Sequence, residues 1–313
     1  FHRSNGAMIS RLSEQNLAKL AAVYSGLVFG IYWIPLRALE QAGFPGLWAT
    51  AVFNLASVLI MIPIVVRHRH RLFPGRLRLH LIGFGTGLGY ALYATAFVYT
   101  EVVNVIVLFY LMPIWGFLLA RVFIADPITP ARFWSMVVGF AGLWVILGEG
   151  ASLPFPDNAG DWMALFAGFV WAAFALLILM DGKEEAAVYA TGFVFWALVI
   201  TVVSALLVSA HGDLPQADWP ALVDVFPWMI PFAMVVIVPA AIATVYAPTK
   251  LNPGIVGILF MAEISVGTIT AAIWADEPFG TRQLLGIGLI TVAGILETAW
   301  VFLGRNRSAP DKK

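Results

Sequence analysis

The apolar residues of the chain fall into ten long segments that short polar gaps separate. Each segment has about 17 to 25 residues, which suits a helix across a ~30 Å hydrocarbon core. Only helices and closed barrels satisfy their backbone polar groups in lipid, and these segments are too long and continuous for barrel strands. The sequence therefore predicts an all-α polytopic membrane protein with ten transmembrane helices, at about residues 17–39, 46–66, 79–99, 102–123, 132–148, 160–180, 187–209, 226–247, 252–274 and 283–303.

Composition supports this prediction. Apolar residues make up 61% of the chain and charged residues 12%, whereas a soluble domain has about 25% charged residues. The second and seventh helices are nearly wholly apolar, so we expect them at the lipid-facing periphery. Residues 1–7 resemble a tag remnant ahead of a natural start at Met8. Cysteine is absent, which excludes disulfides and cysteine-ligated metal sites.

The positions of Lys and Arg predict the orientation, because basic residues resist translocation. With a cytoplasmic N-terminus and ten crossings, 16 of the 18 Lys and Arg residues lie inside, and only Arg37 and Arg282 lie outside. We therefore expect a protein of the inner membrane with both termini in the cytoplasm. The basic cluster at 67–80 is interpreted as an anchor to anionic lipid rather than a metal or nucleic-acid site, and no nucleic-acid partner is expected.

A short motif occurs twice, about 150 residues apart. The fourth helix ends in ADPIT at 125–129 and the ninth in ADEPFG at 275–280. Each half holds five helices, an odd number, so the second copy must cross in the opposite direction, with Asp126 facing the cytoplasm and Glu277 the exterior. Inverted repeats are typical of secondary transporters. The predicted organisation is a tag remnant and cytoplasmic N-terminal segment at 1–16, five-helix repeats at 17–150 and 151–304, and a cytoplasmic tail at 305–313.

These features resemble a known family. The five-plus-five helices, Pro113 in the fourth helix, the turn at 277–280 and the following QLLG and VAG motifs at 283–286 and 292–294 are similar to the EamA branch of the drug/metabolite transporter superfamily. Within it, the chain resembles exporters of the YddG type, which are associated with efflux of aromatic and other amino acids across the inner membrane. The resemblance implies two EamA-like repeats. Asp126 stands where the family usually has Glu.

The third helix carries candidate cavity residues. Thr86, Tyr90, Tyr93 and Phe97 follow one another at helical spacing, so they share a face that could hold an apolar or aromatic side chain. A plain packing face with hydrogen-bonded tyrosines explains the stripe equally well. Two glycine pairs in 83–89 should let neighbouring helices approach closely.

Aromatic residues of other helices are also candidates. Tyr24 and Trp171 lie deep in the first and sixth helices, and Tyr246 lies near the end of the eighth. Interfacial aromatic residues anchor proteins in membranes more often than they bind ligands, so Tyr32, Trp33 and Tyr246 carry less weight.

Glu263 is the one acidic residue near the centre of a predicted span. A carboxylate in hydrocarbon costs at least ~2.5 kcal/mol, so it must face protein or water. Three interpretations stay open: recognition of an ammonium group, proton coupling, or a structural hydrogen bond. Asn104 and Asn252, near the starts of the fourth and ninth helices, are interpreted as helix caps.

Pro113 in the fourth helix and Pro239 in the eighth remove backbone hydrogen bonds and should kink both helices. Such kinks supply hinges for gating or are simple bends. Pro113 and Pro239 are therefore candidate gating or kink residues.

The combined prediction is a secondary transporter that exports aromatic and other apolar amino acids through a central cavity by alternating access. It has no P-loop, zinc-protease motif or nucleophile elbow, so we expect no enzyme, no catalytic residue, no cofactor and no metal. Expected partners are amino acids, membrane lipid and, if transport is coupled, protons, and we expect a monomer. Alternatives are an exporter of other small metabolites or drugs, and an intramembrane lipid-modifying enzyme. A carrier of phosphorylated sugars would need basic residues at mid-depth, where this chain has none.

Overall fold

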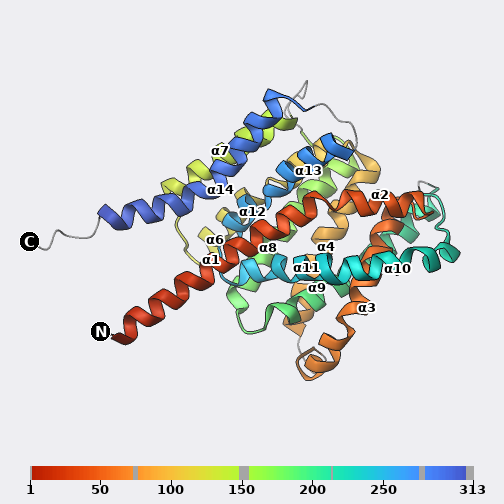
Figure 1. The fold of residues 1–313 in the computed structure, drawn as a ribbon, viewed down its shortest axis with the longest axis horizontal. Helices are drawn as coiled ribbons and strands as arrows, with labels where there is room; N and C mark the ends of the chain where they lie inside the picture. Colours follow the sequence, from red (N-terminus) through yellow and green to blue (C-terminus); the bar gives the residue numbers. More distant parts are fainter. Residues whose placement is uncertain (1, 73–76, 148–154, 213, 275–278, 308–313) are drawn as a thin grey trace, which may run out of the picture.

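The computed structural model is a bundle of helices, described for residues 2–72, 77–147, 155–212, 214–274 and 279–307 (Figure 1). No strand occurs in these ranges, which confirms the all-α prediction. The helices are α1 His2–Gly30, α2 Trp33–Gln41, α3 Leu47–Leu72, α4 Leu77–Tyr99, α5 Val102–Phe109, α6 Met112–Phe123, α7 Pro130–Leu147, α8 Ala159–Asp181, α9 Ala186–Ala210, α10 Leu222–Phe232, α11 Val238–Tyr246, α12 Pro253–Phe260, α13 Ala262–Trp274 and α14 Thr281–Arg307.

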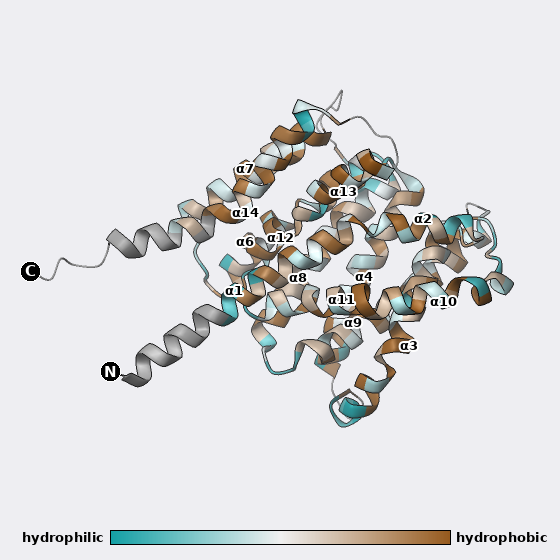
Figure 2. Ribbon diagram, in the orientation of Figure 1, coloured by the Kyte–Doolittle hydropathy of each residue, from teal (hydrophilic) through white to brown (hydrophobic). Residues whose placement is uncertain are grey.

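Nine helical segments of the described part are long and apolar enough to cross a membrane, from Glu14–Gln41 to Pro253–Trp274. They overlap the first nine predicted spans. The tenth predicted span lies within α14, whose apolar part, Thr281–Leu296, is shorter. Figure 2 shows apolar residues along the helices and hydrophilic residues mainly at the turns between them. These features support a multi-pass membrane protein.

Equivalent helices of the two halves pack against each other. The second span, α3, packs on the seventh, α9; α6 of the fourth span packs on α12 of the ninth; and α7 packs on α14. Figure 1 shows α7 and α14 side by side along one edge of the bundle. In addition, α4 contacts α8, and α11 contacts α1, which links the third span to the sixth and the eighth to the first.

Glycines allow the closest of these approaches. A Cβ atom on Gly83 would lie 2.8 Å from the carbonyl carbon of Gly192 in α9, and one on Gly85 would lie 2.2 Å from the ring of Phe174 in α8. Both distances are far below van der Waals contact, so only glycine fits. The prediction that glycines of the third helix admit close neighbours is confirmed.

The expected peripheral position of the second and seventh helices is wrong in part. Every residue from Leu47 to Asn54 in α3 is buried, and Tyr189 in α9 is only 1% exposed. The two helices bury these faces against each other and against α4. An apolar sequence does not separate a helix that faces lipid from one buried by neighbouring helices.

Polar contacts mark the two ends of the bundle. At one end, Asp126 pairs with Arg132 at 2.9 Å and Lys250 pairs with Glu14 at 2.9 Å. At the other end, the hydroxyl of Thr100 donates to Asp161 at 2.7 Å. We call these the Asp126 end and the Asp161 end. Part of the basic cluster lies at the Asp126 end and pairs with carboxylates at and after the end of α8: Arg78 with Asp181 and Arg71 with Glu185.

Four spans are interrupted. The first breaks at Ile31–Tyr32, the fourth at Tyr110–Leu111 and the ninth at Met261. The eighth changes to a π-helical turn over Ala233–Ile237 before α11 begins. Such breaks free backbone groups from the helical ladder and recur at functional sites. The breaks in the fourth and ninth spans occupy corresponding positions about 150 residues apart.

The two prolines assigned to kinks lie beside these breaks. Pro113 is the second residue of α6, directly after the interruption of the fourth span, and Pro239 is the second residue of α11, directly after the π turn. Proline is tolerated in the first turn of a helix because its missing N–H has no intrahelical partner there. Both positions are therefore helix starts as well as bends.

Candidate functional site

The acidic residue of the ninth span lies where two interrupted helices meet. Glu263 is in the first turn of α13, just after the break, and the hydroxyl of Tyr110, in the break of the fourth span, donates to its Oε2 atom at 2.7 Å. The same hydroxyl lies 3.0 Å from the carbonyl oxygen of Phe260, at the end of α12. One O–H is thus shared between two acceptors, which leaves acceptor capacity for a further donor such as an ammonium group.

Tyrosines of α4 extend this polar centre. Tyr93 lies close enough to Glu263 for its hydroxyl to interact with the carboxylate, and its ring packs on Phe109 at 4.3 Å and on Phe97 at 5.0 Å. Less than one turn away, the hydroxyl of Tyr90 lies 2.8 Å from that of Tyr32, in the break of the first span. Glu263, Tyr90 and Tyr93 all keep partial exposure.

The four residues of the predicted stripe on the third helix therefore lie in different surroundings. Tyr93 and Phe97 lie on the Glu263 side and Tyr90 on the side of the first span, but Thr86 joins neither. The hydroxyl of Thr86 is buried and donates to the carbonyl oxygens of Ile82 and Gly83 in its own helix. This bond satisfies the side chain locally, so Thr86 is a packing residue in this conformation.

The other predicted aromatic residues differ in position. Trp171 is 6% exposed and packs on Phe260 and Phe193, with ring centroids 6.4 and 5.5 Å away. It therefore adjoins the break of the ninth span. Tyr24 is 38% exposed and Tyr246 packs on the edge of the core, and neither side chain makes a hydrogen bond or ring contact with the other described candidates.

Two residues discounted as interfacial lie inside the bundle. Tyr32 pairs with Tyr90, as above, and the indole N–H of Trp33 donates to the hydroxyl of Thr270 in α13 at 3.0 Å. That hydroxyl lies 3.3 Å from the carbonyl oxygen of Gly30. The prediction of an interfacial position is wrong because the first span breaks at Ile31, and Tyr32 then lies beside α4 and Trp33 beside α13.

Sequence reasoning also missed Tyr110 and Asn54. Tyr110 lies three residues before Pro113, and a polar ring in mid-span beside a proline is a usable signal for a helix break. Asn54 is the single amide in the apolar segment of the second span. It is 8% exposed, and its side-chain nitrogen has no hydrogen-bond partner among the described residues.

Asn252 caps α12 and joins the two halves. Its side-chain oxygen accepts from the backbone N–H of Gly254 at 2.8 Å, which confirms the capping prediction. Its amide nitrogen donates to Asp126 at 2.7 Å. The corresponding prediction for Asn104 is wrong, because α5 begins at Val102 with Glu101 at the N-cap position. Glu277, the counterpart of Asp126, lies outside the described residues.

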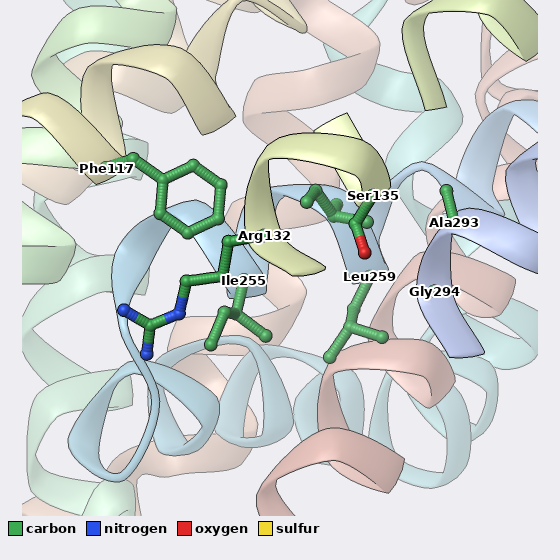
Figure 3. Close-up of a pocket in the computed structure, with 8 residues that line it drawn as sticks. Phe117, Arg132, Ser135, Ile255, Leu259, Ala293 and Gly294 are labelled. Atoms are coloured by element: carbon green, nitrogen blue, oxygen red, sulfur yellow. The ribbon is translucent and has the colours of Figure 1, made fainter. Parts of the chain in front are cut away.

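A small, partly open pocket lies near the Asp126 end, between α6, α7, α12 and α14 (Figure 3). It contains none of the predicted site residues. Arg132 at its edge pairs with Asp126 and lies 5.9 Å from the ring centroid of Phe117. The pocket is lined by Phe117, Arg132, Ser135, Ile255, Ile258, Leu259, Ala293 and Gly294. Within the described ranges, no group of three His, Cys, Asp or Glu residues could hold a metal ion.

Comparison with known proteins identifies the first half of the chain. Residues 16–148 match the EamA-like transporter family. This segment is thus similar to EamA-like transporter domains. The resemblance seen in the sequence is thereby confirmed, and the matched segment lies over the first predicted repeat, 17–150.

The curated relatives that the chain matches are exporters by name. The "Threonine/homoserine exporter RhtA" of Escherichia coli strain K12 is 27% identical over 173 residues, which are 55% of this chain and 56% of the relative. The same protein from E. coli O157:H7 matches equally. The chain thus spans about half the length of the curated relatives it matches. One crystal structure is similar with a TM-score of 0.71 at 16% identity, covering 93% of this chain and 99% of that one, which shows a shared fold.

Proposed function

We propose that the protein is a secondary transporter that exports amino acids across the bacterial inner membrane by alternating access, and that it is not an enzyme. The observation that carries this proposal is the Glu263–Tyr110 contact at two facing helix breaks. Discontinuous helices that present polar groups in mid-span are the usual substrate sites of transporters. The EamA match and the exporter names of the relatives support the same class.

The packing of the helices supports two inverted five-helix repeats, at 17–150 and 151–304. A two-fold axis in the membrane plane places equivalent spans against each other, as in α3 with α9, α6 with α12 and α7 with α14. It also requires that a contact of the third span with the sixth be mirrored by one of the eighth with the first, and both contacts occur. We propose ten crossings, with both termini in the cytoplasm.

Glu263 is proposed as the site of the substrate ammonium group. Its carboxylate and the Phe260 carbonyl oxygen share a single tyrosine proton, whereas an ammonium group brings three donors. Tyr90, Tyr93, Phe97 and Trp171 supply aromatic surface around it. We propose aromatic and other apolar amino acids as substrates, with export of other metabolites or drugs as the alternative. The relatives are named for threonine and homoserine, so polar amino acids belong in the test.

The test is transport by purified protein in liposomes, with a panel of labelled amino acids that includes phenylalanine, leucine and threonine, and glucose 6-phosphate as a non-substrate. We expect the protein to transport amino acids and not the sugar phosphate. Glu263→Gln should lose at least ~10-fold in uptake, because a charge-assisted bond is replaced by a neutral one. The control is Glu101→Gln, which changes an exposed glutamate without a capping bond.

Repeating the assay with and without a pH gradient separates the interpretations of Glu263. If Glu263 couples protons, the variant loses its response to the gradient and keeps exchange; if it binds ammonium, both activities fall together. Amino acid transport that is indifferent to the variant would leave Glu263 a structural residue. A wild type that moves no amino acid would contradict the proposed function itself.

The orientation is tested separately, and the absence of native cysteine makes single-cysteine labelling direct. Ile128 and Phe279, both exposed, flank the two repeated motifs. With inverted repeats, Ile128→Cys and Phe279→Cys react with an impermeant thiol reagent from opposite sides of the membrane. Labelling from the same side would contradict the inverted arrangement.

A further inference from the structure

Asn54 is an unsatisfied polar group deep in the bundle. Its side-chain nitrogen is buried and lacks a hydrogen-bond partner in the described part of the chain. The residues before it in α3, from Leu47 onward, are all buried as well. A buried donor without a partner is costly, which indicates that something outside the protein completes it.

The neighbours of Asn54 are also donors. Asn54 lies close enough to Tyr90 for one amide proton to approach the tyrosine oxygen, which leaves the second amide proton without an acceptor. The hydroxyl of Tyr90 in turn lies 2.8 Å from that of Tyr32. In a pair of hydroxyls only one proton lies between the two oxygens, so the second O–H remains able to donate. The adjacent residue, Phe53, packs on the ring of Tyr32 at 4.8 Å and holds it in place. Amide and hydroxyl protons thus gather at one point between α3, α4 and the break of the first span.

This donor cluster lies beside the proposed ammonium site. Tyr90 faces Tyr32, while Tyr93, less than one turn further along α4, faces Glu263. The Cβ atoms of positions three apart on a helix lie ~5–6 Å apart, and both Tyr90 and Tyr93 lie within electrostatic range of Glu263. The two clusters therefore adjoin, as binding of the two charged groups of one α-amino acid requires, because these groups are attached to the same carbon atom. The sequence places no Lys or Arg at mid-depth, so a carboxylate here must be bound by neutral donors.

We propose that Asn54, Tyr32 and Tyr90 bind the carboxylate of the amino acid whose ammonium group lies at Glu263. This inference rests on the proposed function and adds the second half of the substrate site. It makes the site selective for zwitterions. A carboxylic acid without the amino group brings no positive charge to balance the Glu263 carboxylate. An amine without the carboxyl group brings no acceptor for the Asn54 amide.

The experiment compares Asn54→Leu with wild type on two ligands. One is the amino acid that the wild type transports best in the panel; the other is the amine that results from removing its carboxyl group, 2-phenylethylamine in the case of phenylalanine. We expect KM for the amino acid to rise at least ~10-fold, as for a lost hydrogen bond to a charged group. Inhibition of transport by the amine should not change. Tyr90→Phe should show the same pattern with a smaller shift.

The matched control is Ser57→Ala, one turn along α3, because the Ser57 hydroxyl is satisfied by the carbonyl oxygen of Phe53 at 3.1 Å. It should leave both ligands unaffected. Ligand-induced protection against thermal unfolding gives a second measurement: Asn54→Leu should unfold at the same or a higher temperature without ligand, and lose the shift that the amino acid causes.

An equal loss for amino acid and amine, or no loss for either, would overturn the inference while leaving amino acid export intact. A wild type that transports no amino acid fails at the earlier step, so the two failures are distinguishable.

Discussion

The two parts of the interrupted ninth span have different surroundings. Every residue of α12 is buried, whereas only Ile264, Ser265 and Thr270 are buried in α13. The helix α12 starts at the Asp126 end, where Asn252 bonds to Asp126, and packs on α6 so closely that a Cβ atom on Gly116 would lie 2.4 Å from the Gly254 nitrogen. The helix α13 also packs closely on α1, where a Cβ atom on Gly30 would lie 2.7 Å from the Glu263 carbonyl oxygen, but most of its described residues stay at least partly exposed.

The corresponding part of the first half behaves like α13. The helix α5 occupies the position in the fourth span that α12 occupies in the ninth, and it begins with exposed Val102. Two equivalent segments therefore have unequal burial, which is the asymmetry that alternating access requires. On the proposed function, this conformation is sealed at the Asp126 end, with Glu263 at the boundary between the sealed and the accessible part.

The largest effect is expected on stability, from a change in the tight contact between α6 and α12 at the sealed end. Gly116→Val places a branched side chain against the backbone of Gly254, and overpacking of this kind costs about 1–3 kcal/mol or more. We expect a loss of folded protein or a strongly lowered thermal unfolding temperature. Gly288→Val in α14 is the control, because a Cβ atom there meets nothing within 4 Å. If both variants were equally stable, the tight α6–α12 contact would not be what closes this end.

The second-largest effect is expected for Tyr110, which contacts Glu263 at the boundary between the sealed and the accessible part. Tyr110→Phe removes the proton shared by Glu263 and Phe260 and leaves the buried ring in place. Amino acid uptake in liposomes should fall ~10-fold, in line with one hydrogen bond to a charged acceptor. Thr191→Val, which removes a hydroxyl that bonds only to its own helix, is the control and should have no effect. Full activity of Tyr110→Phe would show that the contact does not position the carboxylate.

A moderate effect is expected from the polar contact at the sealed end. Asp126→Leu removes the partner of both Arg132 and Asn252. Ile255→Cys, in the otherwise buried α12, should then react several-fold faster with an impermeant thiol reagent, because closing the end loses ~1–2 kcal/mol of hydrogen bonding. Unchanged reactivity would mean that helix packing alone keeps α12 covered.

The smallest effect is expected for the outer ion pair. Lys250 and Glu14 are partly exposed at the same end, and such pairs contribute at most ~1 kcal/mol. Lys250→Gln should change Ile255→Cys labelling by less than the Asp126 variant does, and added salt should abolish the difference. An effect as large as that of Asp126→Leu would show that the exposed Lys250–Glu14 pair contributes as much to closing this end as the Asp126 contacts do.

Much of the fold was predictable because the hydropathy of a span is a local property. The first nine spans overlap described apolar helices, and the glycine pairs of the third helix admit their neighbours. Glu263 was predictable for the same reason, since one carboxylate in an apolar segment requires partners wherever the chain places it. Its partner was not, because Tyr110 lies 153 residues away.

The sequence by itself thus determined which segments enter the membrane, which glycines allow close packing and which carboxylate needs a polar neighbour. The tertiary structure alone decided that the first and ninth spans break, that Tyr32 and Trp33 lie inside the bundle, that Thr86 bonds to its own helix, and that Asn54 is buried without a partner among the described residues. The physical reason is that entry of a segment into the membrane depends on the hydropathy of its own residues, whereas helix breaks and side-chain partners depend on contacts between segments far apart in the chain.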